Sequence, residues 1–237
     1  MKFVSGAEAA VVEDSLIIAD LHLGMEQELF RRGIRIGDFT DYLIDKTLLL
    51  LRETKCKKLV ILGDIKENVV SLEGEVRRYF DSVLPHASVT VCKGNHDGDI
   101  ERISGIKIAP PEGIVLHGIG MLHGHAWPAP ELMECKTILM GHNHPQLTFF
   151  EGGKKEPHPV WVFCGPEKSA ISKKYPSHNK NLKLVIMPSF NPLLGNDIER
   201  FGGLGPVFRN KLFQWNKAIV YTLGGIKLGT VREIART

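Results

Sequence analysis

Histidines and acidic residues with the spacing of metal ligands follow several apolar runs of this sequence. In the stretch KTILMGHNHP, the apolar residues 137–140 are followed by His142 and His144. Asp20 and His22 follow the apolar run 15–19 with the same one-residue spacing. Because residues two apart on an extended chain point to the same side, both members of each pair could bind one ligand or metal site.

Three further apolar runs end in the same way. They are residues 59–62 before Gly63-Asp64, residues 88–92 before Gly94-Asn95-His96-Asp97, and residues 119–122 before His123-Gly124-His125. Any one of these motifs could be an ordinary turn or a helix cap. Five of them in succession, each at the end of an expected strand, favour one shared site, because ligands bind at the carboxyl ends of strands in open α/β sheets.

The residue types in these motifs indicate a metal centre. Carboxylate and amide oxygens occur together with imidazole nitrogens and without a thiolate, a set that suits Mn, Fe, Zn, Ni or Co. The strand ends offer seven ligand-grade residues of these types. Seven ligands exceed the needs of one tetrahedral ion, so we expect two divalent ions. Asp64 is the candidate bridge, since it follows a strand that we expect at the centre of the sheet.

The elements that must position these residues are predicted to form an α/β fold. The strand patterns alternate with helical patterns at residues 25–32, 38–53 and 73–84, as is typical of α/β proteins. Residues 106–124 have short runs and Gly or Pro turns, which favours antiparallel hairpins, and residues 215–234 predict a closing hairpin.

Composition excludes several classes of protein. The sequence of 237 residues is 43% hydrophobic with a net charge of +3, from 30 basic and 27 acidic residues, which is typical of an ordinary soluble globular protein. The apolar runs are too short to cross a bilayer, so no membrane partner is expected. Glu8, Glu13 and Asp14 interrupt any secretory pattern at the N-terminus. The four cysteines are far apart, and we therefore expect a reducing, cytoplasmic location.

The motifs together resemble those of the calcineurin-like metallophosphoesterases. The matching stretches are Asp20-x-His22, Gly63-Asp64-x-x-Glu67, Gly94-Asn95-His96-Asp97, His123-Gly124-His125 and Gly141-His142-x-His144. The stretches ADLHLG, GHNHP, GPEKSAISKKY and VIMPSFNPLLG also resemble an archaeal group related to the SbcD-type DNA-repair nucleases. The family resemblance implies a sandwich of two mixed β-sheets flanked by helices, and a hydrolase that acts on phosphoester bonds.

The resemblance also implies a role for each motif residue. One metal would be held by Asp20, His22, Asp64 and His144, and the other by Asp64, Asn95, His123 and His142. His96 would face the scissile phosphate and donate a proton to the leaving oxygen. Glu67 stands where the family usually has Asp, and we expect its carboxylate to accept the imidazole N–H of His96. Manganese is the metal that the nuclease resemblance favours.

The sequence indicates the identity of the substrate less clearly than the type of reaction. The nuclease resemblance favours phosphodiesters of DNA or RNA, with Arg31 and Arg32 of FRRGIRIG as candidate phosphate contacts and His125 as a further candidate contact. The seven lysines and three glutamates of residues 151–183 leave a local charge of about +4 that could extend this surface. Lysine-rich segments are, however, most often solvated loops.

Alternative functions and organisations stay open at this point. The enzyme could instead be a phosphodiesterase or phosphomonoesterase acting on small nucleotides, and less plausibly the chain is a metal-binding scaffold without catalysis. We expect a single domain over residues 1–237, within which residues 151–212 could form an insertion or a small cap. The nuclease-like relatives often dimerise, so a homodimer is also open.

Overall fold

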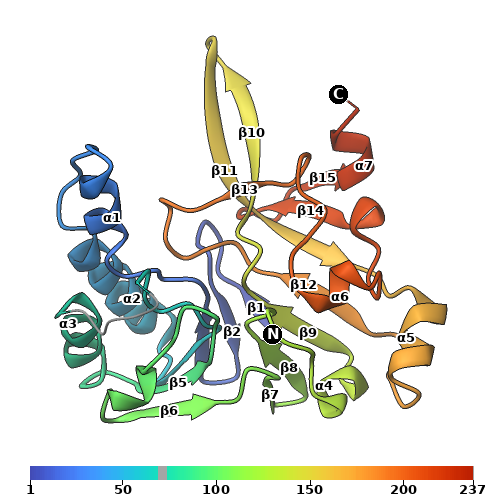
Figure 1. The fold of residues 1–237 in the computed structure, drawn as a ribbon, viewed down its shortest axis with the longest axis horizontal. Coiled ribbons are helices and arrows are strands. Elements are labelled where there is room, and N and C mark those ends of the chain that lie inside the picture. Colours follow the sequence, from blue (N-terminus) through green and yellow to red (C-terminus); the bar gives the residue numbers. More distant parts are fainter. Residues whose placement is uncertain (69–73, 237) are drawn as a thin grey trace.

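A computed structural model describes residues 1–68 and 74–236 of the chain. Two β-sheets pack face to face, and helices cover the two outer faces (Figure 1). This is the predicted sandwich of two mixed sheets flanked by helices, and the fold prediction is confirmed.

The first sheet is formed by the N-terminal part of the chain. Its six strands are β1 (Lys2–Phe3), β2 (Ala10–Val12), β3 (Ser15–Ile18), β4 (Lys58–Ile61), β5 (Ser88–Cys92) and β6 (Ile106–Ala109), in that order across the sheet. The first three strands pair antiparallel, and β3 to β6 pair parallel. The carboxyl ends of β3, β4 and β5 therefore meet at one edge.

The second sheet is formed by the remaining nine strands. They are β7 (Ile114–Leu116), β8 (Ile119–Leu122), β9 (Thr137–Met140), β10 (Pro145–Glu151), β11 (Lys154–Cys164), β12 (Lys183–Ile186), β13 (Asn196–Asp197), β14 (Ile219–Thr222) and β15 (Lys227–Thr230). Strand β9 lies between β8 and β12 and is parallel to both. The β10–β11 hairpin projects from the sandwich as a long arm (Figure 1).

The helices pack on the two outer faces. They are α1 (Met25–Arg31), α2 (Phe39–Thr54), α3 (Gly74–Val83), α4 (Pro130–Glu134), α5 (Lys168–Lys174), α6 (Pro206–Arg209) and α7 (Val231–Ile234), with 3₁₀ turns at Ile100–Arg102 and Trp215–Lys217. Helix α2 begins after Asp38, whose side chain accepts a hydrogen bond from the Asp41 N–H, and ends at Lys55 in the left-handed conformation. The predicted helix 73–84 corresponds to α3, although residue 73 itself lies outside the described residues.

Alternating side chains of the buried strands build separate cores on the two faces of each sheet. In β3, Leu16 and Ile18 pack toward the helices, whereas Ile17 and the following Ala19 pack against the second sheet. Because side chains alternate between the two faces of a strand, these four consecutive, fully buried residues belong to two different cores. The strand is thereby fixed in register, so the polar residues that follow it leave the sheet at a defined position.

One region is arranged differently from the expectation drawn from the sequence. Strand β6 was expected in a hairpin but pairs parallel with β5, and only β7 and β8 form an antiparallel hairpin in that region. The segment 151–212 contributes β11 and β12 to the interior of the second sheet. The division of the chain into a domain and a cap stays a prediction. In the described part of the chain, no helix combines the length and the apolar character needed to cross a membrane.

Candidate metal centre

The two sheets bring their polar strand ends together at one edge of the sandwich. Asp20 and His22 follow β3, and their N–H groups donate to the carbonyl oxygens of Gly63 (3.1 Å) and Asp64 (2.9 Å) after β4. From the second sheet, the N–H of His142 donates to both carboxylate oxygens of Asp20 at 3.1 Å. These bonds tie the ends of β3, β4 and β9 into one cluster.

A first group of side chains could hold one metal ion. One ligand atom from each of Asp20, His22, Asp64 and His144 lies within 4.8 Å of the others. The Nε2 atoms of His22 and His144 are buried and have no hydrogen-bond partner in the described structure. Because a buried imidazole nitrogen left without a partner is unfavourable, a cation between these atoms fits the donor set.

A second group could hold another ion. Ligand atoms of Asp64, His123 and His142 lie within 4.8 Å of one another, and Nε2 of His123 is 3.1 Å from Oδ1 of Asn95. The Nδ1–H of His123 donates to the carbonyl oxygen of Leu62 at 2.9 Å. That bond fixes the ring so that Nε2 is the atom turned toward the group, as is usual for a histidine that binds metal.

Asp64 belongs to both groups. Its Oδ2 lies 3.5 Å from Nε2 of His22 in the first group and 3.3 Å from Nε2 of His123 in the second. Its Oδ1 accepts a hydrogen bond from the N–H of His96 at 2.9 Å. A carboxylate shared in this way has the position required of a bridge between two ions, which stand about 3.5–4 Å apart in dinuclear sites.

His96 and Glu67 lie beside the first group, but their contact differs from the expectation. The Nδ1–H of His96 donates to the main-chain carbonyl oxygen of Glu67 at 2.9 Å. The carboxylate of Glu67 instead accepts the Nδ1–H of His22 at 2.7 Å. The expected bond between the Glu67 carboxylate and His96 is thus replaced, because the carboxylate is engaged by His22 and the Nδ1–H of His96 by the main chain. Atoms of His22, Glu67 and His96 also lie within 4.8 Å of one another.

The electrostatics of the cluster favour charged carboxylates. Burial disfavours the charged forms of Asp20 and Asp64, but the neighbouring imidazoles of His144 and His123 outweigh it and lower both pKa values. Burial also opposes the imidazolium of His123, yet its hydrogen bond to Asp64 and the charge of Asp20 raise its pKa to about 9. The Asp20 charge similarly raises the pKa of His144 despite its burial.

His142 has the opposite behaviour. Its burial and the neighbouring charge of His123 lower its pKa to about 3. His142 is therefore neutral near pH 7 and can offer a nitrogen lone pair without first losing a proton.

The backbone of the cluster is unusual. Five of its non-glycine residues have positive φ angles, a conformation that is uncommon for such residues: Asp20 (57°), His22 (43°), Asp64 (49°), His142 (67°) and His144 (44°). They are half of the ten non-glycine residues with positive φ in the described chain. Strain gathered at one place is a general sign of a functional site.

Two glycines of the motifs are required because candidate ligand side chains pack directly against their Cα atoms. A Cβ on Gly94 would stand 2.2 Å from Oδ1 of Asp64, and a Cβ on Gly63 would stand 2.7 Å from the ring of His123. Both distances are far below contact, so any side chain at these positions would displace a candidate ligand.

Several residues that support the cluster were not recognised in the sequence. The buried carboxylate of Asp97 accepts the N–H groups of Ile65 and Gly94, both at 2.8 Å, and so links the two loops. Ser189 Oγ donates to the carbonyl oxygen of Asp20 at 2.9 Å, and Asn191 Nδ2 to that of Leu21 at 2.8 Å. The stretch MPSFNP was noticed only for its resemblance, because nothing local in it indicates a partner so distant in sequence.

The predicted substrate contacts have different placements. The ring of His125 lies beside the second group, with its centroid 5.3 Å from that of His123. Arg31 is the last residue of the exposed helix α1 and Arg32 follows it, and both pair with Glu28 at 2.9 Å. The structure therefore brings His125 to the cluster, while the two arginines remain near it only through the chain that connects His22 to α1.

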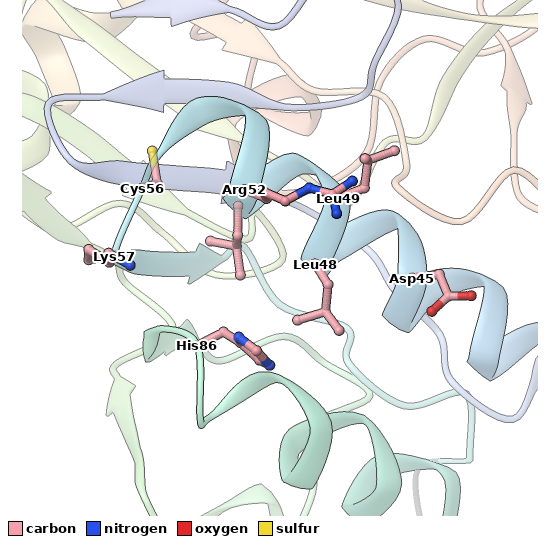
Figure 2. Close-up of a pocket in the computed structure, with 8 residues that line it drawn as sticks. Asp45, Leu48, Leu49, Arg52, Cys56, Lys57 and His86 are labelled. Carbon is pink, nitrogen blue, oxygen red and sulfur yellow. The ribbon is translucent and has the colours of Figure 1, made fainter.

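A separate hollow of about 490 Å³ lies between the C-terminal half of α2 and the segment after α3. Leu48, Leu49, Arg52 and His86 line it, and it contains none of the candidate ligands (Figure 2).

Comparisons with solved structures find proteins of similar fold. Among solved structures, the nuclease MPE of Pseudomonas putida is similar with a TM-score of 0.56 and 18% identity, over 91% of this chain and 88% of that chain. The phosphoesterase Yfce of E. coli has a TM-score of 0.36 and 18% identity, over 60% of this chain and 75% of that chain. At such identities the similarity to MPE supports the fold alone. No significant match was found among curated protein sequences.

The family comparison reaches further than the fold. Residues 15–167 match the model of the calcineurin-like phosphoesterases. This range includes every candidate ligand and covers more than half of the chain. The chain therefore belongs to the calcineurin-like phosphoesterase family, whose members are metal-dependent hydrolases of phosphoester bonds.

Proposed function

We propose that this protein is a dinuclear metal-dependent phosphodiesterase that hydrolyses nucleic acid, as the SbcD-type nucleases do. The observation that carries the proposal is the position of Asp64, which lies in both groups of candidate ligands and joins them. The ligands are Asp20, His22, Asp64 and His144 for one ion, and Asp64, Asn95, His123 and His142 for the other.

Two divalent ions bound there would supply an activated water molecule and neutralise the charge of the phosphate oxygens. The residues of the chain provide the remaining functions. Asp20 and Asp64 remain ionised because their pKa values are low, and they balance the charge of the cations. The hydrogen bond from His22 to Glu67 holds the imidazole with its Nε2 toward the first group.

His96 is the proposed proton donor. Its Nδ1–H is occupied by the carbonyl oxygen of Glu67, so Nε2 is the nitrogen that can contact a substrate. Its ring lies 5.0 Å from that of His22 between centroids, beside the first group but only partly buried. From this position His96 would protonate the leaving oxygen, while Glu67 orients His96 through its main chain and His22 through its side chain.

Nucleic acid is the proposed substrate class. The fold is shared with a nuclease, and Arg31 and Arg32 lie at the end of α1, a helix that begins three residues after His22. The half-buried His125 is a candidate contact for the phosphate or the leaving group at the second group. We further propose manganese as the metal, with Fe, Zn, Ni or Co as alternatives that the same ligands allow. The four cysteines are free and buried, which suits the cytoplasmic location that we propose.

The test uses metal-stripped protein to which Mn²⁺ is added back. Bis-p-nitrophenyl phosphate, p-nitrophenyl phosphate, 2′,3′-cyclic nucleotides and labelled single- and double-stranded DNA and RNA are assayed together, with His96→Ala as the control. Light scattering of the same samples distinguishes a monomer from a homodimer.

Cleavage of nucleic acid and of the diester, lost in the variant, is the expected result. Turnover of the small esters alone would move the function to nucleotide metabolism. Uptake of two ions without turnover of any substrate would contradict the enzyme proposal and favour a metal-binding scaffold.

A further inference from the structure

A second basic site lies outside the candidate metal centre. It is a hollow of about 450 Å³ between the segment after β13, the 3₁₀ turn Trp215–Lys217 and α7. Arg200, Arg232 and Arg236 line it, and Glu199 is the one acidic residue among the described residues of its wall. The wall also contains Phe201 and the buried Trp215. We name this hollow the arginine pocket.

The three guanidinium groups have no acidic partner within the described chain. The arginines with ion pairs there are Arg31, Arg32, Arg78 and Arg102. Glu233, the acid beside Arg232, accepts hydrogen bonds from the N–H and hydroxyl of Thr230 at 2.8 and 2.9 Å, in a capping box at the start of α7. Three exposed arginines therefore share one hollow without being neutralised.

The arginine pocket is tied to the candidate centre by a short segment. The N–H of Asn196 donates to the carbonyl oxygen of His144 at 2.7 Å. At the other end, Gly205 packs so closely that a Cβ there would stand 2.1 Å from the carbonyl oxygen of Gly124. The pocket residues 198–202 lie between these two anchors. Arg200 is four residues from Asn196, so the two lie at most about 14 Å apart.

The chemistry of the pocket selects its ligand. A guanidinium presents a planar fork of N–H donors that matches the oxygens of a phosphate, and Phe201 offers a partly exposed ring on which a base can stack. The upper limit of about 14 Å between Asn196 and Arg200 corresponds to at most about four nucleotides at the 3.4 Å rise of a stacked strand. An extended phosphodiester chain can therefore reach from one site to the other.

We propose that Arg200, Arg232 and Arg236 bind backbone phosphates of the nucleic-acid strand that is cleaved, with Arg200 within about four nucleotides of the scissile bond. This inference rests on the proposed function. It predicts that the arginine pocket contributes to the affinity for long strands and is irrelevant for substrates too short to reach it.

The test compares two triple variants with the same change in net charge. One is R200Q/R232Q/R236Q, and the control is R52Q/R77Q/R102Q, which removes three arginines from the helical side of the first sheet. Binding of a labelled 20-nucleotide single strand is measured by fluorescence anisotropy in EDTA, where no metal-dependent cleavage occurs. KM and kcat with Mn²⁺ are measured for the 20-mer, a dinucleotide and bis-p-nitrophenyl phosphate.

For the pocket variant we expect Kd and KM for the 20-mer to rise at least about tenfold, since hydrogen bonds to charged groups are individually worth about that factor. The slope of log Kd against log salt concentration should fall by about 2, from three contacts of about 0.7 each. Values for the dinucleotide and the small diester should equal those of the control.

Equal 20-mer affinities in the two variants, or an equal loss on all three substrates, would overturn the proposal. The proposed function is tested separately by the wild-type protein. A wild type that binds the 20-mer through the pocket without cleaving any phosphoester would refute the catalytic proposal and leave the pocket standing.

Discussion

The two sheets contribute different chemistry to the candidate centre. The first sheet supplies the carboxylates of Asp20 and Asp64, which are fully or almost fully buried and have lowered pKa values. The first sheet also supplies the imidazole of His22 and the amide of Asn95, whereas the second sheet supplies imidazoles alone, those of His123, His142 and His144. We call these the acidic half and the imidazole half.

The acidic half supplies negative charge, whereas the imidazole half supplies neutral ligands. Two carboxylates can balance much of the charge of two divalent cations, whereas imidazoles bind metal as neutral donors. The acidic half is ionised in advance, but the imidazole half is not fully deprotonated in advance, because His123 and His144 have raised pKa values. The two halves should therefore respond differently to mutation and to pH.

The largest effect is expected from Asp64→Asn, because Asp64 joins both groups. This variant should retain less than one ion, whereas His144→Ala, which alters the first group alone, should retain one. Turnover of the Asp64 variant should fall by more than the roughly 10²–10³-fold typical of removing one preorganised electrostatic contact. Elemental analysis of dialysed protein measures the ions. Two ions retained by Asp64→Asn would show that Asp64 is not the bridge.

His96→Ala should have the next largest effect. We expect a loss of about 10²–10⁴-fold in kcat, as is typical for a general acid, with both ions retained. The matched variant is His125→Ala, next to the imidazole half, for which we expect a smaller loss. If His125→Ala lost more than His96→Ala, the proton donor would belong to the imidazole half.

Asn191→Ala tests the support of the acidic half. The variant leaves the buried carbonyl oxygen of Leu21 without its donor, at a cost of about 1–3 kcal/mol in the free energy of unfolding. It should also weaken metal binding about 10–100-fold, as loss of a residue that orients ligands usually does. Asn210→Ala, which removes an exposed hydrogen bond to Pro206, is the control. Thermal melts and metal titrations measure both effects, and equal results for the two variants would remove Asn191 from this role.

Metal binding should release about one or two protons at pH 7. His123, with a pKa of about 9 in the metal-free protein, and His144, with a raised pKa, must lose a proton to bind, whereas the carboxylates are already ionised. Affinity should therefore rise with pH up to about 9 and then level off. Calorimetry in buffers with different ionisation enthalpies counts the protons. An affinity independent of pH between 6 and 9 would contradict the assignment.

The raised pKa of His123 also determines how the free energy of unfolding of the metal-free protein changes with pH. The pKa of His123 is higher in the folded chain than the ordinary value of 6.5. Its protonation thus stabilises the folded state fully below pH 6.5, and this contribution disappears as the pH rises through about 9. Urea unfolding in EDTA at pH 6.5 and pH 9 would measure the difference.

The sequence was sufficient for features that depend on local patterns. Each candidate ligand follows a buried strand, and the motif types alone predicted their gathering at one edge. Features that depend on contacts between distant parts of the sequence could not be predicted from local patterns. Three examples are the parallel pairing of β6, the position of β12 between β9 and β11, and the hydrogen bond that His22 donates to Glu67. Each results from packing between segments that are distant in the sequence.

The supporting hydrogen bonds illustrate the same limit. Nothing around Ser189 or Asn191 distinguishes them from ordinary turn residues, because Ser and Asn next to a proline are common in turns. Their partners, Asp20 and Leu21, are 169 and 170 residues away along the chain.

The long sequence separation between these hydrogen-bond partners has a consequence for folding during synthesis on the ribosome. At about 5–20 residues per second, roughly 10–30 s pass between the synthesis of Asp20 and that of Ser189. During this interval the first sheet can form, but the main-chain carbonyl oxygen of Asp20 lacks its hydrogen-bond donor, Ser189. The growing chain is therefore expected to complete its candidate metal centre, and with it the hydrolase activity of its family, only after residues 189–191 have been synthesised.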